Sequence, residues 1–176
     1  MKELCFQPFP ELITPRLRLR CLADKDAARV LRLRSDPQML KYIDIPVCKN
    51  ETDAIAFIRK MDGFAERNES INWGIASKDD DLMLGTICIW NVSKEKDSAE
   101  LGYMLLPELQ GQGLMQEALE AVMDYGFREM GCSVLEGWTH RDNKSSIRLL
   151  ERNMFVHDIE SVSTESDLVT RYYRMV

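Results

Sequence analysis

The chain has 176 residues, the size of one domain and enough to bury a core without disulfides or metals. Its 23 Lys and Arg residues against 29 Asp and Glu residues give a net charge of −6, which disfavours nucleic acid as a partner because proteins that bind it present basic surfaces. The five cysteines are widely spaced without a C-x-x-C pair, which excludes a zinc ribbon and disfavours a disulfide framework. Because the sequence also shows no signal peptide and no apolar run of about 20 residues, we expect a cytoplasmic protein that does not bind membranes.

The first part of the chain predicts an arm, a strand and two helices. Residues 1–12 mix Pro and aromatic residues without a period, so we expect an N-terminal arm followed by a single domain over 13–176. Arg alternates with Leu or Cys over 16–22, the period of a half-buried strand, whose basic face either binds an anion or is solvated at a sheet edge. Helical spacing of apolar residues predicts helices over 25–34 and 51–68.

The rest of the chain predicts strands and helices in a mixed order. Three sequential antiparallel strands are expected over 71–76, 82–90 and 99–106. A long amphipathic helix follows over 112–130, with Gly131 as its C-cap. A strand over 133–139, a helix from Asp142 or Asn143 to about Arg152, and strands over 155–159 and 169–175 complete the chain. This order predicts a mixed α/β (α+β) domain.

The strongest motif is a loop with two glycines between a strand and the long helix. Gly111 and Gly113 allow backbone N–H groups to converge, and the helix N-terminus adds partial positive charge, so the loop is suited to a phosphate or pyrophosphate. A Walker loop is rejected because no Lys-Ser/Thr pair follows, and a dinucleotide fingerprint is rejected because Gln116 stands where its third Gly belongs. The pattern Q-x-x-G-x-[G/A] of an acyl-CoA pyrophosphate loop fits Gln110 and Gly113. The alternative is a strand-to-helix turn without a ligand.

Four stretches carry a family resemblance in the correct order: 14–20 (TPRLRLR), 99–103 (AELGY), 110–119 (QGQGLMQEAL) and 143–151 (NKSSIRLLE). They resemble the GNAT superfamily of N-acetyltransferases, nearest to its Rim-type branch of ribosomal-protein alanine acetyltransferases, over roughly residues 12–176. The resemblance implies a mixed, mostly antiparallel central sheet, splayed at the acyl-CoA site, with helices on both faces. It also implies acetyl-CoA as co-substrate, no metal, and an amine acceptor that is either a protein N-terminus or a small molecule, and it allows a homodimer.

The same resemblance implies roles for individual cofactor-binding residues. Backbone groups of Tyr103, Met104 and Leu105 would pair with the pantetheine arm. Asn143 would bind the cofactor near its pantetheine end, and Ser146 would lie close to the thioester sulfur. The pyrophosphate would be held by the backbone N–H groups of the loop and helix start, which are those of Gln110, Gly111, Gln112, Gly113, Leu114 and Met115.

The chemistry of acetyl transfer adds two candidate catalytic residues. An amine must lose a proton to become a nucleophile, so a general base is needed, and Glu100 lies on the strand that leads to the loop. Its alternative is a solvated or salt-bridged strand residue. Ser146 is the candidate donor to the departing sulfur, and its alternative is a first-turn Ser that bonds the backbone. Asn143 is also placed to cap the late helix.

The chain departs from the family pattern at three places. Met115 replaces the small residue at the sixth loop position, Leu150 occupies the slot where many members carry a Tyr acid, and Met154 precedes Phe155 where Gly is usual. We therefore expect an N-acetyltransferase that moves acetyl from acetyl-CoA to a primary amine by direct transfer in a ternary complex. The alternatives are a non-catalytic acyl-CoA-binding or regulatory domain and, less favoured, a transferase of a longer acyl group.

Overall fold

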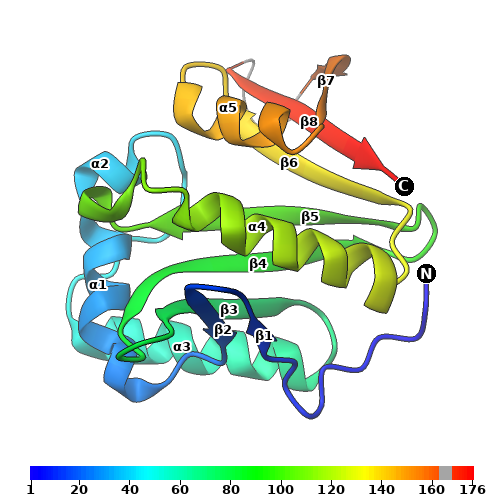
Figure 1. Cartoon of the computed structure of the whole chain (residues 1–176). Helices are drawn as coiled ribbons and strands as arrows, with labels where there is room; N and C mark the ends of the chain where they lie inside the picture. The colour runs from blue at the N-terminus through cyan, green and yellow to red at the C-terminus, as the bar shows by residue number, and fades with distance from the viewer. Residues whose placement is uncertain (163–167) are drawn as a thin grey trace.

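The computed structural model describes residues 1–162 and 168–176, and the side chains of Glu160 and Val162 are outside that description. Its centre is an eight-stranded sheet in the order β1-β2-β3-β4-β5-β6-β8-β7 (Figure 1). All neighbouring strands are antiparallel except β5 and β6. The strands are β1 (Leu12–Ile13), β2 (Leu17–Arg20), β3 (Ile71–Ser77), β4 (Met83–Ser93), β5 (Ser98–Leu105), β6 (Val134–His140), β7 (Val156–Val162) and β8 (Val169–Met175).

Helices cover both faces of this sheet, as the family resemblance implies (Figure 1). One face carries α4 (Leu114–Asp124) and α5 (Lys144–Arg152), and the other carries α1 (Ala27–Ser35) and α3 (Glu51–Glu66). A short helix, α2 (Pro37–Leu40), and 3-10 turns at Asp24–Asp26 and Pro107–Leu109 complete the described helical segments, with a π-helical turn at Tyr125–Glu129 that extends α4. The mixed α/β (α+β) domain predicted from the element order and the mostly antiparallel sheet implied by the resemblance are both confirmed.

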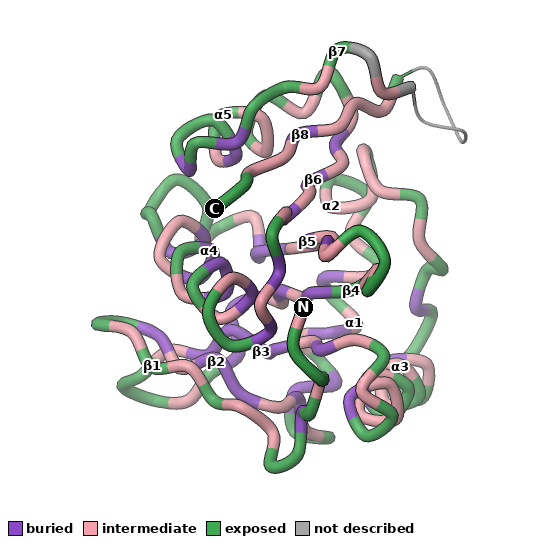
Figure 2. Tube along the Cα trace, turned by 90° about the vertical axis from the view of Figure 1, so that its right-hand side faces the viewer, coloured by how far each residue is buried: buried purple, intermediate pink, exposed green. Residues whose placement is uncertain are grey.

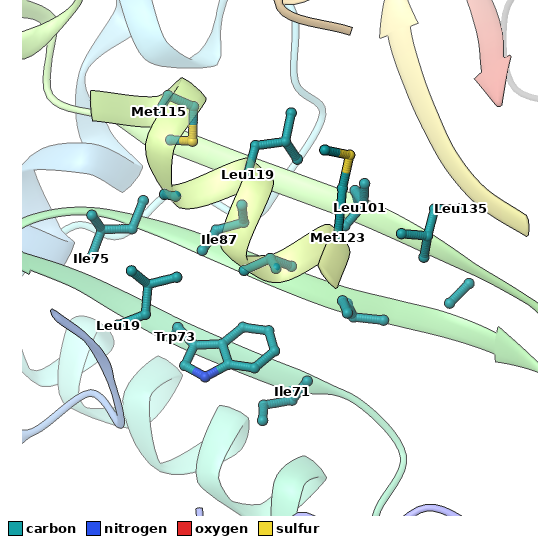
Figure 3. Packing of buried hydrophobic residues seen from close by; sticks show 14 of the residues in the cluster. Leu19, Ile71, Trp73, Ile75, Ile87, Leu101, Met115, Leu119, Met123 and Leu135 are labelled. Atoms are coloured by element: carbon teal, nitrogen blue, oxygen red, sulfur yellow. The ribbon is translucent and has the colours of Figure 1, made fainter. Parts of the chain in front are cut away.

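The main core lies between the sheet and α4. Figure 3 shows Trp73 and Ile87 beneath Leu119, with apolar side chains from neighbouring strands on both sides. The period of two along each strand and the stripe of Ala118, Leu119 and Val122 on α4 bring these residues together. A second cluster joins α1 and α3 to the opposite face and includes Met104 and Leu106. The core therefore anchors the end of β5 from both sides.

Local signals explain most helix ends. Asn50 caps α3 by accepting a hydrogen bond from the N–H of Asp53 (3.0 Å), and Gly131 follows the π-helical turn with φ +69°, as a C-cap requires. Two elements are missed by the sequence patterns: α2, because it is a single turn started by Pro37, and β1, because it is two residues long. Since β1 pairs with the outer side of β2, the alternative that β2 is an edge strand is wrong.

The N-terminal arm packs onto the domain (Figure 2). The Phe6 side chain is 1% exposed, and its N–H donates to Oδ1 of Asn68 (2.7 Å). The indole N–H of Trp73 donates to the carbonyl of Pro10 (2.7 Å), and the boundary expected after residue 12 falls inside β1. The arm is thus part of the main core.

Candidate active site

A gap in strand pairing opens between β5 and β6. The two parallel strands pair only over Ser98–Leu101 and Val134–Gly137, whereas β5 continues to Leu105 and β6 to His140 (Figure 1). At Gly137 an added Cβ would lie 2.8 Å from a methyl carbon of Leu150, so the glycine allows α5 to pack closely at the point of divergence. The sheet is splayed where the resemblance places the acyl-CoA site.

Main-chain groups at the end of β5 face this gap. The N–H of Leu106 donates to the carbonyl of Leu84 (3.1 Å), so this residue turns toward β4. The main-chain N–H and C=O groups of successive residues in a strand point in alternating directions. Those of Met104 therefore also point toward β4, while those of Tyr103 and Leu105 point toward the gap. The side chain of Gln110 already donates to the Leu105 carbonyl (3.0 Å). Tyr103 and the N–H of Leu105 are therefore the groups that could pair with an extended ligand.

The loop before α4 presents a cluster of N–H donors. Gly111 and Gly113 have φ of +76° and +77°, which L side chains rarely adopt, and Gly113 is the N-cap of α4. The N–H of Gln110 is bonded to the Pro107 carbonyl (3.2 Å). Within the described residues, no acceptor is bonded to the N–H groups of 111–116. These donors, at the positive end of α4, suit a pyrophosphate.

An ion pair outside the loop holds it in place. The guanidinium of Arg16 binds Glu117 of α4 (2.7 Å) and donates to the carbonyl of Gln112 (3.0 Å). Glu117 also accepts from the hydroxyl of Thr14 (2.5 Å) and the N–H of Arg16 (2.8 Å). Burial opposes ionisation, but these hydrogen bonds hold the pKa of Glu117 below its ordinary value. Arg16 and the neighbouring Arg18 and Arg20 are all in ion pairs, so the strand's basic face is occupied by the chain's own carboxylates.

A cavity of about 380 Å³ joins the gap to the loop. Its walls come from the end of β5, the loop, the start of α4, α5, and the segment around α2. Its lining residues include most of those predicted from the sequence: Tyr103, Met104, Leu105, Gln110, Gly111, Gly113, Leu114, Met115, Asn143 and Ser146. The residues that the sequence patterns missed are Gln38 and Met39 of α2, Tyr42 and Ile43 just after it, and Gln116, Ser145, Arg148, Leu149 and Arg152 on α4 and α5. The helical spacing of Ser145, Arg148, Leu149 and Arg152 is the signal that could have found them.

Two predicted site residues are outside the cavity lining. The carbonyl of Gln112 is held by Arg16, and its side chain donates to the carbonyl of Glu108 (3.1 Å). Glu100 lies on β5 opposite Trp90 of β4 and Glu136 of β6, on the sheet face away from α4, and accepts from the amide of Asn91 (3.3 Å). A role for Glu100 in catalysis would therefore have to be exerted from the face opposite α4.

A pair of hydroxyl groups lies inside the cavity. The phenol oxygen of Tyr103 is 2.8 Å from the hydroxyl oxygen of Ser146, and burial raises the pKa of Tyr103 to about 12. Tyr103 is therefore protonated at neutral pH. Asn143 caps α5 by accepting from the N–H of Ser146 (3.2 Å), as its position predicts. The sequence patterns place Tyr103 only as a main-chain group, so they miss its side chain.

The departures from the family pattern have structural explanations. The side chain of Met115 is 9% exposed and packs in the main core, so it does not fill the loop. Leu150 is fully buried against Gly137, where it has no hydroxyl to offer a substrate. Met154 adopts φ +62°, a conformation that favours the usual glycine. In the described part of the chain, no group of His, Cys, Asp and Glu could hold a metal ion, and no helix is long and apolar enough to cross a membrane.

Comparisons with known proteins agree with this geometry. An acetyltransferase (GNAT) domain model matches residues 16–156. The uncharacterised N-acetyltransferase YoaA of Bacillus subtilis is 31% identical over 142 residues, which cover 81% of this chain and 80% of YoaA. Among solved structures, one from Vibrio cholerae described as a ribosomal-protein-serine acetyltransferase has a TM-score of 0.83 at 19% identity and covers 96% of this chain and 99% of its own. RimL, a ribosomal L7/L12 α-N-protein acetyltransferase solved with coenzyme A, has a TM-score of 0.81 at 19% identity over 95% of this chain and 98% of its own. The chain therefore belongs to the GNAT family of acetyl-CoA-dependent N-acetyltransferases.

Proposed function

We propose that this protein moves the acetyl group of acetyl-CoA directly to a primary amine within a ternary complex. The observation that carries the proposal is the continuity of one cavity from the N–H cluster before α4 to the hydroxyl pair of Tyr103 and Ser146. A pyrophosphate needs the first end and a thioester sulfur needs the second. RimL, which shares this fold, is solved with coenzyme A.

The residues present fit the cofactor in three places. The N–H groups from Gly111 to Met115 would hold the pyrophosphate, and Gln110 would support the loop through its bond to Leu105. The main-chain groups of Tyr103 and the N–H of Leu105 would pair with the pantetheine amides, as an added strand does. Asn143 and Ser146 at the start of α5 would contact the pantetheine end near the sulfur.

The transfer itself requires two proton movements. The amine nitrogen attacks the thioester carbon, a C–N bond forms, and the C–S bond breaks to release the CoA thiolate. The amine proton passes to Glu100 through a water molecule, because Glu100 itself does not line the cavity. A proton from the Ser146 hydroxyl neutralises the thiolate while Tyr103 passes its proton to Ser146, and solvent returns a proton to Tyr103 as Glu100 releases the one taken from the amine. The pair would thereby take the place of the Tyr acid that Leu150 replaces.

The acceptor is a protein N-terminus or a small amine. The net charge of −6 favours the approach of a cationic acceptor. A non-catalytic acyl-CoA-binding domain is the second candidate, and the burial of Leu150 at the usual acid position is the observation that favours it. The two candidates predict the same cofactor affinity but different turnover.

Turnover distinguishes them directly. The full chain is incubated with acetyl-CoA and a panel of peptides and small amines, and free thiol is followed over time. We expect at least one amine to raise thiol release well above the hydrolysis seen without acceptor. Tight CoA binding with no amine-dependent release across peptides and small amines would refute the enzyme in favour of the binding domain.

A further inference from the structure

Two arginines line the cavity from α5. Arg148 and Arg152 lie one helical turn apart, and they are the charged side chains among the described lining residues; the others are neutral. A cation in the last turn stabilises a helix, which accounts for Arg152, but Arg148 lies one turn earlier and repels it, so helix stability does not account for the pair. Its placement indicates a role for positive charge at this wall.

Neither arginine has a hydrogen-bond or ion-pair partner in the part of the chain that the structure describes. Other arginines are paired with carboxylates, as Arg20 is with Asp26 (2.8 Å) and Arg171 with Glu136 (2.8 Å). Within the residues that the structure describes, no acceptor is bonded to Arg148 or Arg152, and both are exposed. In a chain with a net charge of −6, two adjacent cations without a carboxylate partner indicate an anionic ligand.

The location of the two arginines indicates which anion they bind. The amides of Gln116 and Asn153 exchange two hydrogen bonds (both 2.9 Å) that fasten the end of α5 to the first turn of α4. Arg152 therefore lies at the end of the cavity where α4 begins, and Asn143 and Ser146 lie at the other end of α5. The N–H groups of the loop before α4 would bind the pyrophosphate, so the two arginines would bind a different phosphate. Coenzyme A carries one more, the monoester on the ribose 3′ carbon.

We propose that Arg148 and Arg152 form the subsite for the 3′-phosphate of acetyl-CoA. The inference rests on the proposed function, because it requires the cofactor to occupy this cavity. A phosphate monoester presents several oxygens and close to two negative charges at neutral pH, and the planar guanidinium is suited to such a group. The subsite would make the enzyme prefer CoA over its 3′-dephospho form.

Binding measurements with CoA and 3′-dephospho-CoA test the subsite. The variants are Arg148→Gln, Arg152→Gln and both together, with Arg59→Gln on α3 as a control of equal charge change far from the cavity. We expect wild type to bind CoA about tenfold or more tightly than dephospho-CoA at low salt, and each single change to weaken CoA binding about fivefold. Dephospho-CoA binding is unchanged in every variant, and the double variant shows no preference. Added salt should reduce the wild-type preference.

Other outcomes overturn the inference in distinguishable ways. Equal affinity of the wild type for both ligands would overturn the subsite alone and leave the proposed function intact. Equal weakening of both ligands in the variants would assign the arginines to the pyrophosphate, which also contradicts the proposal. Failure of wild type to bind either ligand would refute the proposed function and the subsite with it. Because both side chains are exposed, thermal unfolding of the variants should match wild type and show that the fold is intact.

Discussion

At the scale of single residues, the hydroxyl groups of Tyr103 and Ser146 meet from different elements. Tyr103 comes from β5 and Ser146 from the first turn of α5, and their oxygens are 2.8 Å apart. The late-helix position where many family members carry a Tyr holds the fully buried Leu150. The cavity therefore does contain a phenol, which comes from β5. The presence of Leu at position 150 would, by itself, suggest that the cavity has none.

The variant Tyr103→Phe tests whether this phenol takes part in protonating the thiolate. The ring remains and the hydroxyl is lost, so we expect kcat to fall at least about tenfold with little change in KM for acetyl-CoA, because thiolate protonation is impaired and binding is not. Tyr125→Phe is the control: burial raises the pKa of Tyr125 to about 12 as well, but its ring packs against Trp73 in the main core. Steady-state kinetics on both variants decide the matter, and equal kcat for the two variants would remove Tyr103 from proton donation.

Glu100 is the residue whose proposed role most needs a measurement. If it accepts the amine proton, Glu100→Gln should lower kcat/KM by about 100-fold near neutral pH and abolish the acid limb of the pH–rate profile. Glu95→Gln, in the exposed turn before β5, makes the same change away from the site and should leave activity intact. A pH–rate profile of Glu100→Gln that matches wild type would exclude this carboxylate as the base.

At the scale of elements, the strand–loop–helix unit of β5 and α4 determines where a ligand can bind. The second cluster holds Met104 and Leu106 on one face, and α4 holds the other face, so the end of β5 is rigid. Arg16 and Glu117 then tie the loop to the turn between β1 and β2. A rigid loop retains its N–H groups in a convergent arrangement before the ligand arrives, which lowers the entropic cost of binding.

Gly113→Val should disturb this unit locally. At φ +77° a β-branched side chain is strained by at least about 1–2 kcal/mol, and the loop would shift its donors to relieve the strain. We expect CoA affinity to fall at least about tenfold while circular dichroism shows a retained fold, since a domain has about 5–15 kcal/mol of stability. Gly63→Ala within α3 serves as the control and should bind CoA normally. Unchanged affinity of Gly113→Val would contradict the assignment of the loop.

At the scale of the whole molecule, the N-terminal arm and the distant strands form one core. Phe6 and Pro10 reach Asn68 and Trp73 across the sheet, and the N-terminal amine pairs with Asp97 (2.5 Å). The arm therefore contributes to the stability of the domain that carries the site.

Phe6→Ala should reveal this contribution. Removing a large side chain that is 1% exposed leaves a cavity, so the free energy of unfolding should drop by about 3 kcal/mol. Glu3→Ala, an exposed position on the same arm, should change it by less than about 0.5 kcal/mol. Chemical denaturation measures both, and equal stability of the two variants would show that the arm is dispensable.

What the sequence by itself determined is local. Strand and helix periods, the caps at Asn143 and Gly131, and the loop of Gly111 and Gly113 depend on residues a few positions apart, and the structure places each of them as predicted. The family motifs likewise lie within short stretches. For this reason the sequence predicts the fold class and about half of the residues that line the cavity.

Only the tertiary structure decided which side chains meet. Long-range packing brings Tyr103 to Ser146, ties α5 to α4 through Gln116 and Asn153, and puts Glu100 on the sheet face away from α4. It also leaves Arg148 and Arg152 without carboxylate partners among the described residues, a property that depends on the elements packed around α5. Such contacts join residues tens of positions apart, and no local period encodes them.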